Sequence, residues 1–487
     1  MKSRLAAALC AALLATPAAA DWADAVNAYN AGDYATAAKE FRPFAENGQA
    51  QAQYILGWIY QNGEGVPQDY AESAKWYELA AKADNVDAQY ALGSYYMAGA
   101  GVARDDAKAA EWFRKAAERG KAGAQYLLGY LLSRGEGVTR DDKEGAAWYR
   151  RAADQGYAEA QYAVGLALGT GIGVDRDEPQ SNAWLRKAAE QGHVDASYLL
   201  GWNYAQGVGT LPDYTEAAKW YRQAAQSGNV EAQYQLATLL RDGRGVAKDE
   251  DAADALFRKA AEAGQASIPA AIDEYLKAGK FDRAVGLAEA WLAKRPDDVQ
   301  LLTLLGVTAA NEARTDPARF GPPAKNYGDR AIALIEGGKR PEGMSDVDWN
   351  EYEHKWLPQL HLRLGAMAQK AGRTEEARTR LEKMTRIAPK DPYGWYLLGQ
   401  THFTEYERIN AQSKGLEGSA KSEAVSKAFG QLDKVIEFYA RAVGLTDGRE
   451  DLADLRAPLM KDLRGIYEFR TGSRAGFDEM LAKYRVN

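Results

Sequence analysis

Four histidines are the residues of this 487-residue sequence best suited to bind a metal ion or to transfer a proton: His193, His354, His361 and His402. No two of them have the i, i+4 spacing that would place both imidazoles on one side of a helix and on one ion. His354 and His361 would lie two helical turns apart, at roughly 10 Å of helix rise. We therefore expect no metal site and no cofactor.

Carboxylates recur in a regular pattern and could do general acid–base chemistry if they met in space. The six aspartates that follow this pattern are Asp69, Asp105, Asp141, Asp177, Asp213 and Asp249. Each precedes an amphipathic segment, where a carboxylate can accept hydrogen bonds from the free backbone N–H groups of a helix start. Successive members would be about 10 Å apart along a stack of helix pairs. We interpret them as helix caps and not as catalytic groups.

Two further patterns could suggest an enzyme, and neither is specific. A Gly-x-Gly motif occurs six times, but each copy follows a predicted helix and lacks the Lys-Ser/Thr pair of a phosphate-binding loop. Cys10 is the only cysteine, and it lies in a segment that we expect to be removed. Thiolate catalysis, disulfides and cysteine-bound metal are then excluded. We predict a protein that is not an enzyme.

The six aspartates and the six Gly-x-Gly motifs belong to a repeat of 36 residues. The block Ala52-Gln53-Tyr54-Ile55-Leu56-Gly57 returns in the same register from Ala88, Ala124, Ala160, Ala196 and Ala232. Each copy predicts a first amphipathic helix, the Gly-x-Gly loop, the aspartate and a second amphipathic helix. A tryptophan recurs in five of the second helices: Trp76, Trp112, Trp148, Trp184 and Trp220. This regularity favours packing between repeats over stacking on a sugar ligand.

The motif A-Q-Y-x-L-G, followed by Gly-x-Gly, Asp, Trp-aromatic and Ala-Ala, resembles the Sel-one-like repeat, a relative of the tetratricopeptide (TPR) repeat. The resemblance implies an all-α fold in which about six such repeats form a right-handed α/α superhelix over residues 49–268. Residues 21–48, with Ala31-Gly32-Asp33-Tyr34, resemble a TPR-type capping repeat. Residues 269–487 resemble further TPR-like helix pairs, with a loop-rich insertion around one short helix at about 314–348.

In TPR-type solenoids the first helix of each pair lines the concave surface, and the residue after its Leu-Gly points inwards. By this resemblance the groove would carry a set of variable aromatic and polar residues one turn apart on the first helices: Trp58, Gln61, Tyr130, Trp202 and Arg241. Such a surface suits a peptide or protein partner. Ordinary variation of an exposed surface explains the same residues equally well.

The N-terminus has the pattern of a secretory signal peptide. Lys2 and Arg4 precede an apolar stretch from Leu5 to Leu14, and the small residues Ala18 and Ala20 follow Pro17. We expect cleavage after Ala20 and a periplasmic protein, or else a secreted one. The apolar stretch is too short to cross a membrane, and no later stretch is long enough.

The net charge of −7 provides no basic excess with which to bind nucleic acid. The negative charge is concentrated in residues 21–264, which hold 25 basic and 35 acidic side chains, whereas residues 265–487 hold 34 and 33. We therefore expect a protein or peptide partner, no nucleic acid, and a monomer.

The function implied by the resemblance is a scaffold or adaptor that binds envelope proteins through its concave groove. Roles in exopolysaccharide export and in binding host proteins occur among related repeat proteins and stay open as alternatives. A β-lactam-binding or hydrolysing enzyme is a further alternative, although the cysteine-rich members of that kind carry paired cysteines that this chain lacks.

Overall fold

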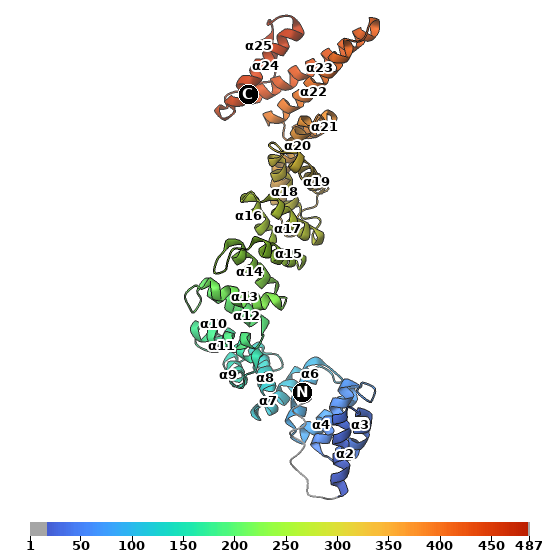
Figure 1. Cartoon of the computed structure of the whole chain (residues 1–487), viewed down its shortest axis with the longest axis vertical. Coiled ribbons are helices and arrows are strands. Elements are labelled where there is room, and N and C mark those ends of the chain that lie inside the picture. The colour runs from blue at the N-terminus through green and yellow to red at the C-terminus, as the bar shows by residue number, and fades with distance from the viewer. Residues whose placement is uncertain (1–16, 486–487) are drawn as a thin grey trace. The chain divides into compact units, whose positions relative to one another are not determined.

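The computed structural model describes residues 17–485, with side chains from residue 22 onwards. The described part is built of α-helices and one short 3-10 helix, without a β-strand, which confirms the predicted all-α class (Figure 1). The chain divides into two compact units, one ending at Ala260 and the other beginning at Ala261. Residues 1–16 of the expected signal peptide lie outside the described residues.

Unit 1 opens with the helix pair α2 (Pro17–Ala31) and α3 (Tyr34–Glu46). The Asp33 carboxylate accepts a hydrogen bond from the Thr36 backbone N–H and caps α3. Trp22 packs edge-on against Phe41 and Phe44, at ring-centroid distances of 5.1 and 5.2 Å. This pair occupies the position expected for a capping repeat.

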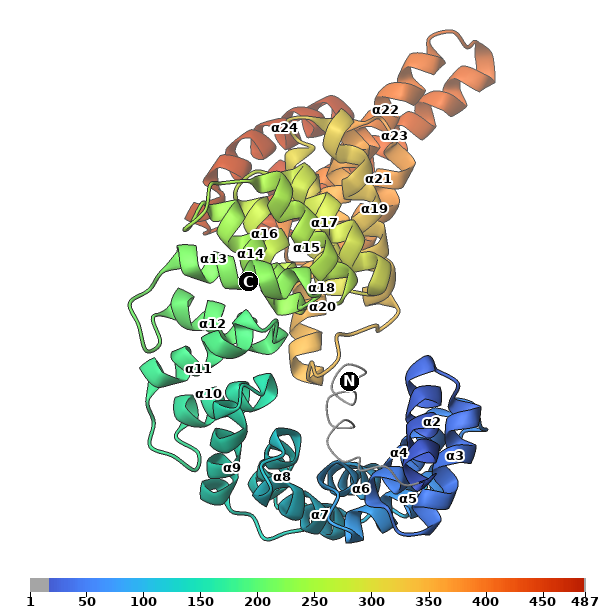
Figure 2. The same ribbon diagram turned by 60° about the horizontal axis from the view of Figure 1, so that its bottom comes forward.

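Six helix pairs follow, and every helix in them has 13 residues. The first helices are α4 (Ala50–Asn62), α6 (Val86–Ala98), α8 (Ala122–Arg134), α10 (Ala158–Thr170), α12 (Val194–Gln206) and α14 (Val230–Asp242). The second helices are α5 (Tyr70–Lys82), α7 (Asp106–Glu118), α9 (Asp142–Asp154), α11 (Glu178–Glu190), α13 (Tyr214–Gln226) and α15 (Glu250–Glu262). Figure 2 shows α4, α6 and α8 on the inner side of the curve that they form with α5, α7 and α9.

The glycine loops connect each pair to the pair before it. The first glycine of each Gly-x-Gly ends the first helix in the left-handed conformation, with φ between 68° and 77°. The second glycine lies against the start of the second helix one repeat earlier. A Cβ atom on Gly137 would lie 2.2 Å from the backbone carbon of Asp106. Because no side chain fits there, glycine is required by contact as well as by conformation.

The six periodic aspartates accept hydrogen bonds from backbone N–H groups at the start of each second helix. Asp141, for example, accepts from the Glu144 N–H at 2.8 Å, and Asp249 accepts from the Ala252 N–H at 2.9 Å. Asp69, Asp105, Asp177 and Asp213 make the same contact. These carboxylates therefore satisfy free donors at helix N-termini, and each does so within its own repeat.

The tryptophans of the second helices are not equivalent in burial. Four are less than a tenth exposed: Trp76, Trp148, Trp184 and Trp220. Trp112 is only half-buried. The residue after the tryptophan packs onto the glycine of the first helix, and a Cβ on Gly57 would lie 2.6 Å from the Tyr77 ring. Tyr77 is 1% exposed, so this second aromatic residue lies deeper in the core than its neighbour.

A row of buried glutamines links consecutive repeats. The sequence pattern alone did not predict this role. In five repeats the amide of the Ala-Gln-Tyr glutamine donates to a carbonyl near the end of the preceding second helix: Gln53, Gln89, Gln125, Gln161 and Gln233. Ser197 replaces the glutamine in the remaining repeat. There the Gln223 amide donates to the Ala189 carbonyl instead. Each helix end thus has a side-chain donor for a free carbonyl.

One buried polar pair breaks the equivalence of the repeats. The Asn203 amide of α12 donates to the Asn182 side-chain oxygen of α11 at 2.7 Å, and the Asn182 amide donates to the Val208 carbonyl at 2.7 Å. The positions of Asn182 in the neighbouring repeats hold Ala146 and Ala218. Both amides are satisfied, as burial requires.

Unit 2 contains helices of uneven length, with α-helices of 6 to 28 residues. They are α16 (Ile268–Lys277), α17 (Phe281–Lys294), α18 (Val299–Glu312), α19 (Pro317–Glu336), α20 (Asp346–Lys370), α21 (Thr374–Ile387), α22 (Pro392–Ser413), α23 (Gly418–Leu445), η1 (Glu450–Leu452), α24 (Ala453–Thr471) and α25 (Phe477–Ala482). The last three α-helices share a core that includes Val443, Leu463 and Leu481.

The expected loop-rich insertion at 314–348 is corrected by the structure. Most of it is the 20-residue helix α19, which contains Pro322 and Pro323 in its interior. Gly306 of α18 and Gly328 of α19 allow the two backbones to approach closely, since a Cβ on Gly306 would lie 2.8 Å from the Gly328 Cα. Tertiary packing therefore outweighs the unfavourable proline and glycine propensities that suggested a loop.

Candidate functional site

The first helices of unit 1 carry one surface that repeats along the solenoid, which we call the helix-A face. It comprises three positions of α4, α6, α8, α10, α12 and α14: the second residue of the helix, the tyrosine of Ala-Gln-Tyr and the residue after Leu-Gly. These positions have the spacing i, i+3 and i+7, so they share one side of a helix. For α4, α6 and α8, this helix row lies on the inner side of the curve (Figure 2).

Apolar side chains are exposed on the helix-A face of three consecutive repeats. Trp202 is 38% exposed and Leu166 is 36% exposed, while Tyr130 is half-buried. They occupy the same position of α12, α10 and α8. Neighbouring helices of this kind are about 10 Å apart. A partner that crosses the repeats can therefore contact all three side chains at once.

Trp58 was predicted to contact a partner, and the structure places it against the capping pair. Its ring lies 5.5 Å from the ring of Tyr29 and 5.5 Å from that of Tyr34. The side chain is half-buried in this aromatic cluster. Trp58 thus joins the cap to the first repeat, in addition to any contact that its exposed edge could make.

Gln61 and Arg241 make contacts within their own repeats. The Gln61 side-chain oxygen accepts a hydrogen bond from the Tyr77 hydroxyl at 2.6 Å. The Arg241 side chain is only 14% exposed, pairs with Asp242 at 2.7 Å and lies 5.9 Å from the Phe257 ring centroid. These contacts stabilise the repeat, and the low exposure of Arg241 leaves little of its side chain for a partner.

A ladder of tyrosines on the same face was missed as a feature of the site. Its members are the half-buried tyrosines of the Ala-Gln-Tyr motif: Tyr54, Tyr90, Tyr126, Tyr162, Tyr198 and Tyr234. Two of them also touch the start of the next repeat. Tyr162 stacks on His193, with ring centroids 4.5 Å apart, and Tyr126 lies 5.5 Å from Tyr157. The invariant tyrosine among the six copies was the signal in the sequence that could have revealed this ladder.

Exposed carboxylates lie beside the tyrosine ladder. They come from the second residue of four first helices: Asp87, Glu159, Asp195 and Glu231. Burial and then the nearby Asp87 charge raise the pKa of Tyr54 to about 12. Burial and then the nearby Asp195 charge also raise the pKa of Tyr162 above its ordinary value. Tyr54 and Tyr162 therefore stay neutral at neutral pH, and the helix-A face combines aromatic rings with negative charge.

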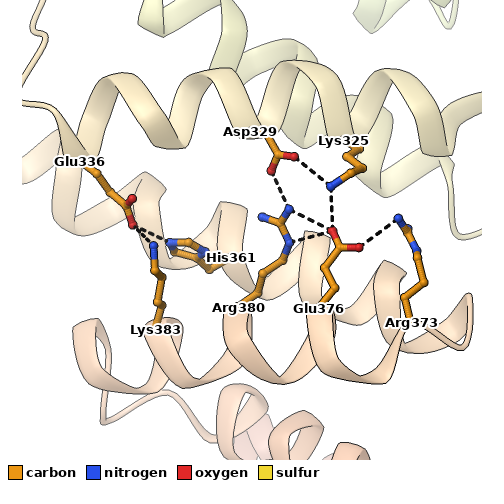
Figure 3. A network of polar contacts seen from close by, with 8 residues as sticks. All are labelled: Lys325, Asp329, Glu336, His361, Arg373, Glu376, Arg380 and Lys383. Atoms are coloured by element: carbon orange, nitrogen blue, oxygen red, sulfur yellow. Dashed lines mark hydrogen bonds and ion pairs between the residues drawn. The ribbon is translucent and has the colours of Figure 1, made fainter.

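A charged network in unit 2 has the residue types of an active site, and Figure 3 shows its arrangement. Lys325 and Arg380 each bind both Asp329 and Glu376, at distances of 2.7 to 3.1 Å. These contacts join α19 to α21. Because each of these charges has a partner of opposite sign, the network is suited to holding helices together and not to transferring protons.

His361 of α20 lies in a second group of polar contacts, with Glu336 of α19 and Lys383 of α21 (Figure 3). Its side chain is 2% exposed, and burial lowers its pKa to about 4. The Nε2 atom lies 3.4 Å from a Glu336 oxygen, which in turn pairs with Lys383 at 2.7 Å. The first contact does not meet hydrogen-bond geometry. His361 is therefore a neutral, buried ring at neutral pH.

Two other kinds of site are not found. Residues 17–485 contain no group of three or more His, Cys, Asp or Glu side chains that could hold a metal ion. Within the same residues, no helix combines the length and the apolar character needed to cross a membrane.

The family model of the Sel1 repeat matches six consecutive segments: 50–85, 86–121, 122–157, 158–193, 194–229 and 230–265. The chain is 30% identical to a Sel1 repeat protein from Oxalobacter formigenes, covering 48% of this chain and 94% of that one, with a TM-score of 0.44. It is 24% identical to c5321, a protective antigen of uropathogenic Escherichia coli with an SLR fold, covering 92% of this chain and 96% of that one, with a TM-score of 0.53. The search of the curated proteins found no match.

The six matched segments coincide with the six helix pairs α4 to α15, and the second structural likeness supports the same fold over most of the chain. Proteins built from such repeats are in general non-catalytic scaffolds for protein–protein interaction. The chain belongs to the Sel1 repeat family.

Proposed function

We propose that this protein is an exported, non-enzymatic scaffold of the cell envelope that binds a protein partner on the helix-A face of unit 1. The observation that carries the proposal is the row formed by Tyr130, Leu166 and Trp202. These side chains occupy one position in three consecutive repeats and are partly accessible. Exposed apolar side chains in a repeated row are typical of a protein interaction site.

The charge of this face limits the kind of partner. Asp195 lies one turn from Tyr198 and two turns from Trp202 on α12, and Glu159 has the same relation to Leu166 on α10. Both carboxylates are exposed. A complementary partner segment would carry apolar or aromatic side chains next to lysine or arginine. Aromatic rings also attract such cations, which strengthens the same preference.

The proposed location rests on residues 1–20. Their positive start, apolar middle and small residues before Ala20 are the pattern of a cleaved export signal. Fractionation of expressing cells with intact-mass measurement tests this part. We expect the protein in the periplasmic fraction, with a mass that corresponds to a chain starting at Asp21. A full-length chain that stays in the cytoplasm would contradict export.

The binding part is tested by crosslinking the tagged protein in cells and identifying captured species by mass spectrometry. We expect one dominant envelope protein in the wild-type sample. Trp202→Ala combined with Leu166→Ala should reduce its capture at least tenfold. Asp195→Asn combined with Glu159→Gln should also reduce capture, and capture by this variant should depend less on salt than capture by the wild type.

Leu211→Ala is the matched control, because Leu211 is an 84% exposed apolar residue on a loop of the same unit and lies outside the helix-A face. It should leave capture unchanged. Circular dichroism of the purified variants should show wild-type helix content. Equal capture by wild type and the Trp202/Leu166 variant would remove the helix-A face from the proposal.

A further inference from the structure

Unit 2 contains a cavity that is separate from the helix-A face. Its volume is about 860 Å³, within the range of sites that bind small molecules or short peptide segments. It lies between α18, α20 and α22 and includes the turn after α18. Three helices that are distant in the sequence therefore build one site, and no short sequence motif marks it.

Three cationic side chains line this cavity: Arg314, Arg363 and Lys370. The Arg363 Nε donates to the Asn311 side-chain oxygen at 2.9 Å, and its Nη1 donates to Gln359. Lys370 donates to the Arg314 backbone carbonyl at 2.8 Å. The acceptors in these contacts are neutral. The positive charges are thus oriented by the protein, but no carboxylate pairs with them among the contacts of the described residues.

Burial lowers the pKa of Arg363, and the nearby Arg314 cation lowers it further. The two cations repel each other, and an anion bound between them would offset this repulsion. The one carboxylate in the lining, Asp391, caps α22 by accepting from the Tyr393 N–H at 2.8 Å. The cavity therefore has a net positive lining.

The remaining wall is apolar. Leu362, Ala366 and Met367 come from α20, and Leu397 comes from α22. The Tyr393 ring at the same wall is 45% exposed. Methionine and tyrosine adapt well to varied apolar side chains, and a ligand that fills this wall must carry apolar groups next to its negative charge.

We propose that this cavity binds a short acidic segment of a protein, with a carboxylate on Arg314 and Arg363 and an adjacent apolar side chain against Met367 and Leu397. A small inorganic anion would use the cations and leave the apolar wall uncovered. An acidic peptide uses both, and its backbone can accept hydrogen bonds from Lys370. The site gives the protein a second binding function, whose charge preference is opposite to that of the helix-A face.

The probe is a short fluorescent peptide that alternates glutamate with leucine, and the measurement is fluorescence anisotropy with the full chain. We expect the affinity to fall at least tenfold for Arg314→Gln combined with Arg363→Gln. The same peptide with glutamine in place of glutamate should lose binding to a similar extent. Met367→Gln should weaken binding of the glutamate peptide without changing its dependence on salt.

Arg386→Gln is the matched control, because Arg386 is a 78% exposed arginine of the same unit that lies outside the cavity. It should bind the peptide as tightly as wild type. Arg314→Gln alone provides a variant at an exposed position that leaves the α20 packing intact. The Trp202/Leu166 variant should also bind normally, which separates this site from the proposed function.

Three results would overturn the proposal. They are no binding of the glutamate peptide by the wild-type chain, equal binding of the glutamate and glutamine peptides, and equal binding by wild type and the double arginine variant. Complete displacement of the peptide by inorganic phosphate, with no effect of Met367→Gln, would also overturn it, since the site would then recognise an anion alone.

Discussion

The two units reach the same helical architecture by different means. In unit 1 most contacts recur from repeat to repeat, among them a 13-residue helix, a glycine under the side chain of the second helix and a capping aspartate. In unit 2 the helices differ in length and are joined by individual long-range pairs, such as those of Asp329 with Arg380 and of Lys325 with Glu376. A repeated frame lets surface residues vary freely, whereas in unit 2 one residue can serve both the frame and a binding site.

The largest expected effect is in the core of unit 1. Trp148→Ala should lower the free energy of unfolding by about 3–5 kcal/mol, because it removes a ring that is 6% exposed and leaves a cavity between repeats. The ring also donates to Glu144 at 3.1 Å, and Glu144 pairs with Arg114 of the preceding repeat. Denaturant unfolding measures the loss, and hydrogen exchange locates it.

Trp112→Ala is the control for this prediction, since Trp112 has the same repeat position but is half-buried. Trp112→Ala should lower the free energy of unfolding by clearly less than Trp148→Ala does. For both variants, the faster exchange should be confined to unit 1, because each repeat contacts only its neighbours. An equal loss of unfolding free energy for the two variants would show that burial does not determine how much each tryptophan stabilises the fold. Faster hydrogen exchange throughout unit 2 would contradict the expected confinement of the effect to unit 1.

In unit 2 the expected effect depends on pH. Burial lowers the folded-state pKa of His361 to about 4, whereas an unfolded histidine titrates near 6.5. Below pH 6.5 the unfolded chain binds a proton that the folded chain does not, so stability falls as the pH falls. Between pH 6.5 and pH 5 the loss should be up to about 2 kcal/mol. Melting temperatures across this pH range measure it.

His361→Gln should flatten this pH dependence relative to wild type. The buried His402 also has a lowered pKa, because of burial, but it is present in both proteins and cancels in the comparison. Burial opposes the ionised form of Glu336, but Lys383 outweighs it and lowers the pKa of this carboxyl group. Glu336 therefore affects the pH dependence of stability mainly below this pH range. The same slope in the wild type and the variant would mean that His361 is not the group that titrates.

The smallest expected effect concerns two glycines of unit 1. Gly137 and Gly156 both have positive φ, at 70° and 87°, so an alanine at either costs about 1–2 kcal/mol in conformation. Only Gly137 also lies against the backbone of the preceding repeat. Gly137→Ala should therefore destabilise unit 1 by about 1–2 kcal/mol more than Gly156→Ala. Equal melting temperatures for the two variants would show that the loop contact contributes nothing.

The two units also differ in how far their sequences predict them. The 36-residue period places both helices of each pair, because every copy contains the same capping aspartate and the same Gly-x-Gly motif. In unit 2 the expectation of a loop-rich insertion around one short helix at about 314–348 failed, because the helix α19 is 20 residues long. Pro322 and Pro323 are weak local signals that the packing of Gly306 on Gly328 overrides. Local propensity predicts well only where it agrees with tertiary packing.

Binding residues were harder to predict than the frame. Counting positions after Leu-Gly identified the position shared by Tyr130 and Trp202, but could not show that Gln61 is held by Tyr77 or that Arg241 is turned toward Asp242. The cavity of unit 2 draws residues from positions as distant as Arg314 and Leu397. Such a site forms only when the helices pack together, so no spacing in the sequence predicts it.

The hydrogen bond between Asn182 and Asn203 has a consequence for assembly. A chain of nearly identical repeats could stack out of order, with one first helix docked on the wrong neighbour. In such a misfolded stack, Asn203 would face Ala146 or Ala218 instead of Asn182, and its buried amide would have no partner. That loss is comparable to the cost of an unpaired buried polar group, about 1–3 kcal/mol. The asparagine pair thus favours the correct order of the repeats, because its hydrogen bond forms only when α12 packs on α11.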